Sequence, residues 1–323
     1  MMKYVQIPGV AKPLSRLVYG TGVRKLNSDD KELAAACLDQ AYEAGFRVFD
    51  TAHSYGRAEE NLGAWIKSRG IRDDIVILDK GCNPGQNGSP DVFSAETIRE
   101  HVKMSQERMQ TGFLDLYILH RDDPSRPVGP IVEVLNELHE AGVIGLFGGS
   151  NWTLARVLEA NRYAAEHGLK PFSAVSPNYS LGVLERDPWG GSVTLSGAQG
   201  TEYREWLAQN RLPVFTYSSI SRGFFSGKYD PDSGLSIEDS LPPSPIKEYD
   251  SPANRECLRR AWELSRKKGT AVSTIALAWL LAQPQNIFPI VSPTGTDHIA
   301  DNITALELEL TAEECRYLSD VHV

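Results

Sequence analysis

The sequence predicts a (β/α)8 TIM barrel with long loops on the C-terminal face of the barrel. Eight short, apolar and mostly β-branched segments recur along the 323 residues, and a segment with helical periodicity follows each of them. A doubly wound sheet would instead place a G-x-G-x-x-G turn after its first strand, whereas the turn at residues 20–25 (GTGVRK) lacks the third glycine. We therefore expect a single barrel domain over residues 1–323.

The elements follow an N-terminal β-hairpin in regular alternation. The strands are expected at residues 17–20, 47–50, 75–78, 116–119, 144–147, 173–175, 213–216 and 287–291. The helices are expected at residues 30–44, 59–67, 95–109, 130–140, 154–166, 201–209, 252–281 and 297–306, with a closing helix at 313–319. Two long stretches without an element pattern, 181–200 and 221–254, follow strands. We interpret them as covers for a substrate or cofactor, with a solvated insertion as the alternative.

The net charge and the composition of the chain disfavour several classes of binding partner. The chain has 33 basic and 42 acidic residues, a net charge of −9, which opposes non-specific attraction to nucleic acid or anionic lipid. No apolar signal region starts the chain, and no segment reaches the run of about 18 apolar residues that a membrane span needs. The four cysteines are scattered without a CxxC pair, which is typical of reduced thiols. We expect a cytoplasmic protein with no nucleic-acid, membrane or metal partner, whose oligomeric state the outer helices do not indicate.

Four chemically distinct side chains follow the expected strands two, three and four. Asp50 and Tyr55 lie just beyond strand two, Lys80 ends strand three and His120 ends strand four. The carboxyl ends of barrel strands meet at one mouth, so we expect an acid, a phenol, an amine and an imidazole together there. Taken singly, each has a structural explanation such as a surface ion pair; their joint placement indicates a site.

This set suits the donation of a proton to a carbonyl oxygen. A phenol has a pKa near 10, and we expect the Lys80 ammonium to lower the pKa of Tyr55 by stabilising the phenolate. Asp50 would keep Lys80 charged, and a neutral His120 would hydrogen-bond the carbonyl oxygen and orient it.

The segments around these residues resemble the aldo-keto reductases in order, spacing and flanking residues. They are residues 50–56 (DTAHSYG), 78–81 (LDKG), 116–120 (LYILH), 148–152 (GGSNW), 217–219 (YSS) and 223–229 (GFFSGKY). The resemblance runs from about Leu14 to the C-terminus. It implies a carbonyl reductase that binds NADP or NAD extended across the barrel mouth without a Rossmann fold. It also implies that Tyr55 is the general acid, that Asp50 and Lys80 tune it, and that His120 orients the substrate.

The same resemblance assigns cofactor contacts to residues along the whole chain. They are Gly20, Thr21, Gly22 and Asp50 beside the nicotinamide; Ser150, Asn151 and Ser176 at its carboxamide; Tyr217 stacked on its ring; Ser218, Ser219, Ile220, Ser221, Arg222, Gly223 and Lys228 along the pyrophosphate; and Ser292, Thr294, His298, Asp301 and Asn302 toward the adenine end. Ser176 departs from the family pattern, which commonly has Gln on this strand, so we expect an adjusted carboxamide contact.

Residues 291–302 bear on the choice of cofactor. NADPH-preferring relatives hold the 2′-phosphate with Lys or Arg in this stretch, which here contains neither, and Asp297 adds a negative charge. We therefore expect use of both cofactors, with a tilt towards NADH.

The expected substrate is a small, polar carbonyl compound such as a sugar, contacted by Tyr55, His120, Arg121, Trp152 and Trp189. Two other functions stay open. One is a nicotinamide-binding sensor or accessory subunit with little turnover. The other is a metal-dependent hydrolase barrel, which is disfavoured because only His53 and His120 of the seven histidines lie near the expected mouth.

Overall fold

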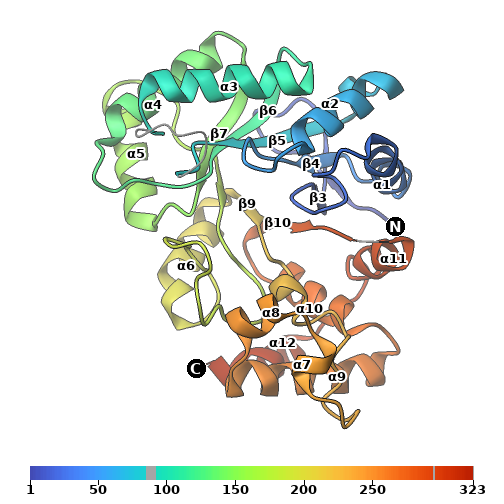
Figure 1. Ribbon diagram of the computed structural model, residues 1–323. Helices are drawn as coiled ribbons and strands as arrows, with labels where there is room; N and C mark the ends of the chain where they lie inside the picture. The colour runs from blue at the N-terminus through green and yellow to red at the C-terminus, as the bar shows by residue number, and fades with distance from the viewer. Residues whose placement is uncertain (85–91, 294, 323) are drawn as a thin grey trace. The chain divides into compact units, whose positions relative to one another are not determined.

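The computed structural model describes residues 1–84, 92–293 and 295–322. Within these residues, eight strands form a closed barrel in the order β10-β3-β4-β5-β6-β7-β8-β9 (Figure 1), which confirms the expected (β/α)8 fold. The barrel strands are β3 (Val18–Gly20), β4 (Val48–Asp50), β5 (Val76–Gly81), β6 (Leu114–Leu119), β7 (Ile144–Ser150), β8 (Ala174–Ser176), β9 (Pro213–Thr216) and β10 (Asn286–Val291).

Helices follow the barrel strands along the chain. They are α1 (Lys31–Glu43), α2 (Ala58–Arg69), α3 (Ala95–Met109), α4 (Val128–Glu140), α5 (Leu154–Glu166), α6 (Thr201–Asn210), α7 (Ile237–Ser240), α8 (Pro243–Tyr249), α9 (Pro252–Lys268), α10 (Val272–Leu281), α11 (Thr296–Thr304) and α12 (Ala312–Ser319). Short 3-10 turns occur at Arg72–Asp74, Ala198–Gly200, Ser221–Gly223 and Asp320–His322.

The chain divides into two compact units. We call Tyr4–Ser176 the N-terminal unit, and Pro177–Val323 together with Met1–Lys3 the C-terminal unit. In the N-terminal unit, β3 to β8 run parallel to one another. Asp50 is in register with Leu78, and Lys80 is in register with Ile118. Parallel pairing therefore brings the carboxyl ends of these strands to one end of the unit.

Aromatic packing joins the helices of the N-terminal unit to its strands. Phe49 of β4 packs on Trp65 of α2 with ring centroids 5.2 Å apart, and Tyr19 of β3 packs on Phe46 at 5.5 Å. All four side chains are at most 2% exposed. Burying a large apolar side chain contributes about 1.5 to 3 kcal/mol, so these contacts fix α2 against β4, the strand that precedes it.

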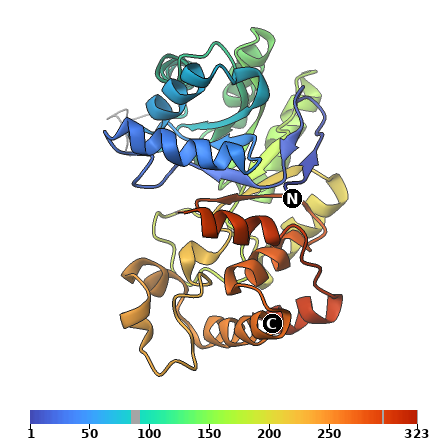
Figure 2. The same ribbon diagram turned by 90° about the vertical axis from the view of Figure 1, so that its right-hand side faces the viewer.

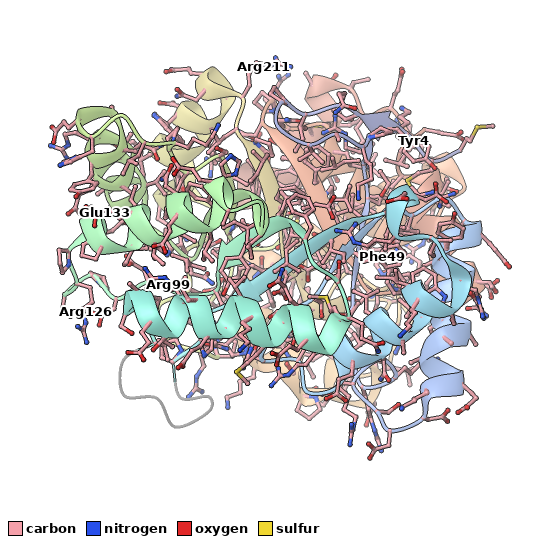
Figure 3. All side chains as sticks on the ribbon, turned by 90° about the horizontal axis from the view of Figure 1, so that it is seen from above. Tyr4, Phe49, Arg99, Arg126, Glu133 and Arg211 are labelled. Atoms are coloured by element: carbon pink, nitrogen blue, oxygen red, sulfur yellow. The ribbon has the colours of Figure 1, made fainter. Side chains whose placement is uncertain are left out.

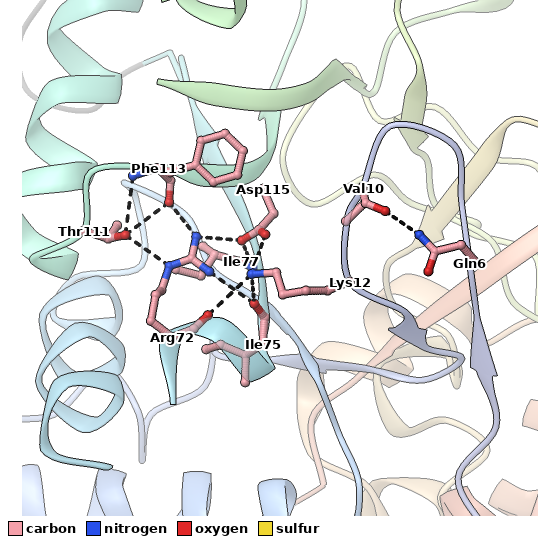
Figure 4. Close-up of polar contacts among 9 residues, drawn as sticks. All are labelled: Gln6, Val10, Lys12, Arg72, Ile75, Ile77, Thr111, Phe113 and Asp115. Carbon is pink, nitrogen blue, oxygen red and sulfur yellow. Dashed lines mark hydrogen bonds and ion pairs between the residues drawn. The ribbon is translucent and has the colours of Figure 1, made fainter. Parts of the chain in front are cut away.

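An ion-pair cluster closes the opposite end of the N-terminal unit, where β5 and β6 begin (Figure 4). Asp115 is 3% exposed and accepts from Lys12 at 2.7 Å, from Arg72 at 2.8 Å and from the backbone N–H of Ile77 at 3.0 Å. Lys12 lies in the turn between β1 (Tyr4–Val5) and β2 (Leu14–Ser15), which form the expected antiparallel hairpin (dark blue in Figure 2). The cluster therefore anchors the hairpin to the strands.

The C-terminal unit differs from the sequence expectation in two places. Residues 252–281 form two helices rather than one, because Gly269 ends α9 with a left-handed φ of 64° and α10 begins at Val272. The stretches 181–200 and 221–254 are not devoid of secondary structure: the first contains a 3-10 turn, and the second contains a 3-10 turn, α7 and α8. Short helices rich in proline and serine have too few residues to show a helical period.

Candidate active site

The four expected catalytic residues lie together in the N-terminal unit. Asp50 is the last residue of β4, Lys80 lies next to the end of β5, and His120 follows β6 directly. Tyr55 lies in the loop between β4 and α2, which continues the sheet pairing because the N–H groups of Thr51 and His53 donate to Leu78 O and Lys80 O at 2.9 and 2.8 Å.

Lys80 connects the members of this group. Its ammonium pairs with Asp50 and donates to the carbonyl of Thr51 at 3.1 Å, and both charged residues are 2% exposed. The Lys80 Nζ lies 5.3 Å from the centroid of the Tyr55 ring. The Tyr55 ring meets that of His120 edge to face, with centroids 5.7 Å apart.

Burial and charge set the protonation states of the group. Burial has the larger effect on the pKa of Tyr55 and raises it above its ordinary value, although Lys80 lowers it as expected. Burial alone would lower the pKa of Lys80, but Asp50 and Tyr55 together raise it. Burial, Lys80 and Arg121 hold the pKa of His120 well below its ordinary value. At neutral pH Tyr55 thus carries its proton, Lys80 is charged and His120 is neutral, a set of states that suits proton donation.

Sequence reasoning missed one contact at this group. The Ser54 hydroxyl lies 3.4 Å from the Nδ1 of His120. Its place directly before Tyr55 is the one sequence signal that could have indicated it.

Residues expected at the nicotinamide also gather in the N-terminal unit. The Ser150 hydroxyl donates to Ser176 O at 2.7 Å, and the Asn151 amide donates to Ser150 Oγ at 3.1 Å and to His120 O at 3.3 Å. Gly20 is in register with Asp50, and the Thr21 N–H donates to Asp50 O at 2.9 Å.

Two buried hydroxyls test whether these residues fit a nicotinamide. Within the described residues, Ser176 Oγ and Thr21 Oγ1 have no hydrogen-bond partner, and both residues are at most 1% exposed. A Cβ on Gly22 would meet the Tyr55 ring at 3.0 Å, so glycine keeps the backbone close to that ring. One hydroxyl with spare capacity next to Ser150 and another next to Asp50 fit an amide-bearing ring.

The C-terminal unit holds the residues expected at the pyrophosphate. Ser218, Ser221 and Arg222 have left-handed φ values of 55°, 52° and 54°, and Gly223 has a φ of 96°. The N–H groups of Ser221 and Gly223 donate to Ser218 O and Ile220 O at 2.7 and 3.0 Å. These two N–H groups therefore serve the turn, which weakens the expectation that they bind phosphate.

Several side chains of residues 218–223 form hydrogen bonds or ion pairs within the protein. Ser219 Oγ donates to Thr216 O at 2.9 Å and to Ile290 O at 3.0 Å, while Ser221 Oγ donates to Ser180 Oγ at 3.0 Å. Arg222 Nε lies 3.2 Å from a Glu248 carboxylate oxygen, and Lys228 is exposed.

The residues expected at the adenine end lie around α11. Ser292 and His298 are exposed, Asp301 is half-buried and Asn302 is buried. Thr294 lies outside the described residues.

The two tryptophans expected at the substrate differ in environment. Trp152 is 1% exposed, donates from Nε1 to Arg121 O at 2.9 Å and packs on Phe172 with ring centroids 4.8 Å apart. Its ring thus supports the half-buried Arg121 rather than opening to solvent. Trp189 of the C-terminal unit is 50% exposed and packs edge to face on Tyr217, with centroids 6.0 Å apart.

The described part of the chain holds neither a cluster of metal-ligating side chains nor a membrane-spanning helix. No three or more His, Cys, Asp or Glu side chains gather there as they would around a metal ion. None of its helices has the length and apolar character that crossing a membrane requires.

Comparison with known proteins gives a family match over nearly the whole chain. Residues 16–322 match the model of the Aldo/keto reductase family. "Aldo-keto reductase str7" of Strobilurus tenacellus is 28% identical over 293 residues, which cover 90% of this chain and 80% of the relative. "Norsolorinic acid reductase stcV" of Emericella nidulans is 28% identical over 315 residues, covering 93% and 75%. An aryl-alcohol dehydrogenase of Pestalotiopsis microspora is 26% identical over 293 residues, covering 88% and 71%. The chain belongs to the aldo/keto reductase family.

Proposed function

We propose that this oxidoreductase reduces an aldehyde or ketone to an alcohol with NADPH or NADH, and that Tyr55 donates the proton. The observation that carries the proposal is the buried Asp50–Lys80 ion pair beside a protonated Tyr55 and a neutral His120. Family membership supports oxidoreductase chemistry and a nicotinamide cofactor.

Each side chain has one task in this reaction. When bound, the reduced nicotinamide supplies a hydride to the carbonyl carbon. Tyr55 gives its hydroxyl proton to the carbonyl oxygen, and Lys80, held charged by Asp50, stabilises the phenolate that remains. His120 donates a hydrogen bond to the same oxygen and orients it.

Ser150, Asn151 and Ser176 would hold the carboxamide, with Gly20, Thr21 and Gly22 beside the ring. The assignments of Tyr217, residues 218–223 and Lys228 to the rest of the cofactor, and of Ser292, Thr294, His298, Asp301 and Asn302 to its adenine end, stay predictions from the resemblance. So does the contact of Trp189 with substrate.

The test is oxidation of NADPH and NADH by the purified protein with a panel of carbonyl compounds. The panel contains short hydroxyaldehydes and sugars, which the half-buried Arg121 favours, and aryl aldehydes, because one relative is named an aryl-alcohol dehydrogenase. Carbonyl-dependent oxidation of either cofactor supports the proposal. Tight cofactor binding without turnover on any member of the panel would instead support the alternative, a nicotinamide-binding sensor or accessory subunit.

A further inference from the structure

We propose that Arg108, at the C-terminal end of α3, is a positioning residue that holds the segment carrying Tyr55. The inference rests on the proposed function, because it concerns the residue proposed as proton donor. Arg108 Nη1 donates to the carbonyl of His53 at 3.2 Å and to a carboxylate oxygen of Glu59 at 2.7 Å. These acceptors lie two residues before and four residues after Tyr55, so the Arg108 side chain bonds to the chain on both sides of Tyr55.

A glycine brings Arg108 to this place. A Cβ on Gly63 of α2 would meet the Met109 backbone at 2.4 Å, so α2 and the last turn of α3 touch directly there. Glu59 lies one helical turn before Gly63 on the same face of α2. Contact between Gly63 and Met109 therefore sets Arg108 next to Glu59.

The segment around Tyr55 continues beyond the end of its pairing with the sheet. Its pairing with the β5 backbone ends at His53, and the side chain of Arg57, the N-cap residue of α2, makes no capping hydrogen bond. Gly56 has a left-handed φ of 56°, and the Arg57 N–H donates to Asn27 Oδ1 at 2.9 Å. The turn between these points carries Tyr55, and Arg108 ties its two ends to α3.

A second contact from α3 acts on the same segment. The ring of His101 stacks on that of His53 with centroids 4.5 Å apart, and His101 Nδ1 accepts from the Cys82 N–H at 3.1 Å. Burial, followed by the charge of Arg108, lowers the pKa of His53 to about 4, so the stacked ring stays neutral. The positive charge of Arg108 therefore lies near a neutral imidazole and pairs with the Glu59 carboxylate.

The contact between Arg108 and Glu59 is a partly buried ion pair. Glu59 is fully buried, whereas the Arg108 side chain is 25% exposed. Asp79 of β5 is also buried, and burial together with the charge of Glu59 raises its pKa to about 8. Loss of Arg108 would leave Glu59 without a cation beside a second carboxyl group, which costs more than the loss of a surface pair.

The test separates positioning from stability with four variants. R108M removes both contacts, E59Q removes the charge but keeps an acceptor, and E59Q/R108M removes both charges together so that no carboxylate is left buried and alone. The control is R99M, which removes a surface ion pair from the same helix, Arg99 to Glu137 of α4 at 2.5 Å. Figure 3 labels Arg99 on α3.

We expect R108M and E59Q/R108M to lower kcat at least about tenfold, with KM and the Kd for NADPH within about threefold of wild type. E59Q and R99M are expected to keep kcat within about threefold. Normalising kcat to NADPH-binding sites removes the effect of unfolded protein. If R108M does not fold, E59Q/R108M is compared with E59Q alone. Equal kcat values in that comparison, or R108M folded with the kcat of wild type, overturn the proposal.

Crystal structures of wild type and E59Q/R108M give a readout that does not depend on turnover. We expect the Tyr55 hydroxyl to move away from Lys80 Nζ in the variant. If wild type reduces no carbonyl compound, the proposed function fails, and an unmoved Tyr55 then overturns this inference separately.

Discussion

Replacing Lys80 with methionine tests how the buried ion pair acts on Tyr55. Lys80 pairs with Asp50, donates to Thr51 O at 3.1 Å and is 2% exposed. Methionine keeps the length of the side chain and removes the charge. Asp50 is then an uncompensated buried carboxylate, and removing one partner of a buried pair costs about 3 to 5 kcal/mol of folding free energy. We expect a lower thermal midpoint for K80M.

The effect on catalysis is separate from the effect on stability. Burial already raises the pKa of Tyr55, and Lys80 is the group that lowers it most. Without the ammonium, the pKa of Tyr55 therefore rises further. The phenolate left after proton donation loses its partner, so kcat is expected to fall at least about a hundredfold. Steady-state kcat and KM with the best carbonyl substrate, together with thermal unfolding followed by circular dichroism, measure the two effects.

Two further variants test whether loss of the Lys80 charge itself lowers kcat. D50N/K80M leaves no buried charge alone, so its thermal midpoint should recover most of the loss while kcat stays low. K12M is the control, because Lys12 also pairs with a buried carboxylate, Asp115 at 2.7 Å, but at the opposite end of the strands, where Arg72 keeps a second ion pair with that carboxylate. It should lower stability and leave kcat unchanged. A K80M kcat within about threefold of wild type, or recovery of kcat in D50N/K80M, would refute the role given to Lys80.

Three other predictions follow from the same structure. Burial and Glu59 raise the pKa of Asp79 to about 8 in the native state, against about 3.9 in the unfolded chain. Between these two pH values the native state holds one more proton than the unfolded state, so the free energy of unfolding falls as pH rises. The thermal midpoint of wild type should therefore drop relative to that of D79N from acid to pH 8, and parallel curves would contradict this. Fluorescence titration should show both cofactors binding, NADH at least as well as NADPH, because the exposed Asp297 opposes a phosphate; a Kd for NADPH more than about tenfold below that for NADH would show the stretch 291–302 to be misread. Short hydroxyaldehydes or sugars should have a higher kcat/KM than steroid ketones, because the half-buried Arg121, whose charge acts on Tyr55 and His120, favours a polar substrate; the reverse order would contradict this.

The sequence predicted the barrel because buried parallel strands are near-continuous apolar runs, and Val48–Asp50 and Pro213–Thr216 read that way without tertiary information. The four catalytic candidates followed from the rule that strand ends share a mouth. Asp79 shows the limit of this reasoning: it and Lys80 are neighbouring polar residues, both buried, on opposite faces of β5, and polarity alone does not tell which face meets solvent.

Other features depend on contacts far apart in the chain. Trp152 is buried because Gly149 lets the ring lie against the backbone, where a Cβ would meet its Cγ at 2.4 Å. Arg108 reaches Glu59 only because Gly63 admits the end of α3. The raised pKa of Tyr55 depends on how deeply the fold buries it, which the spacing of residues does not contain.

The most direct test of the central claim, that Tyr55 gives the proton, compares wild type with Y55F. Phenylalanine keeps the ring that packs against His120 with centroids 5.7 Å apart and removes only the hydroxyl. Carbonyl reduction should fall at least about a hundredfold in kcat, while the Kd for the reduced cofactor stays within about threefold of wild type. A Y55F variant that reduces the substrate at close to the wild-type kcat would contradict the account.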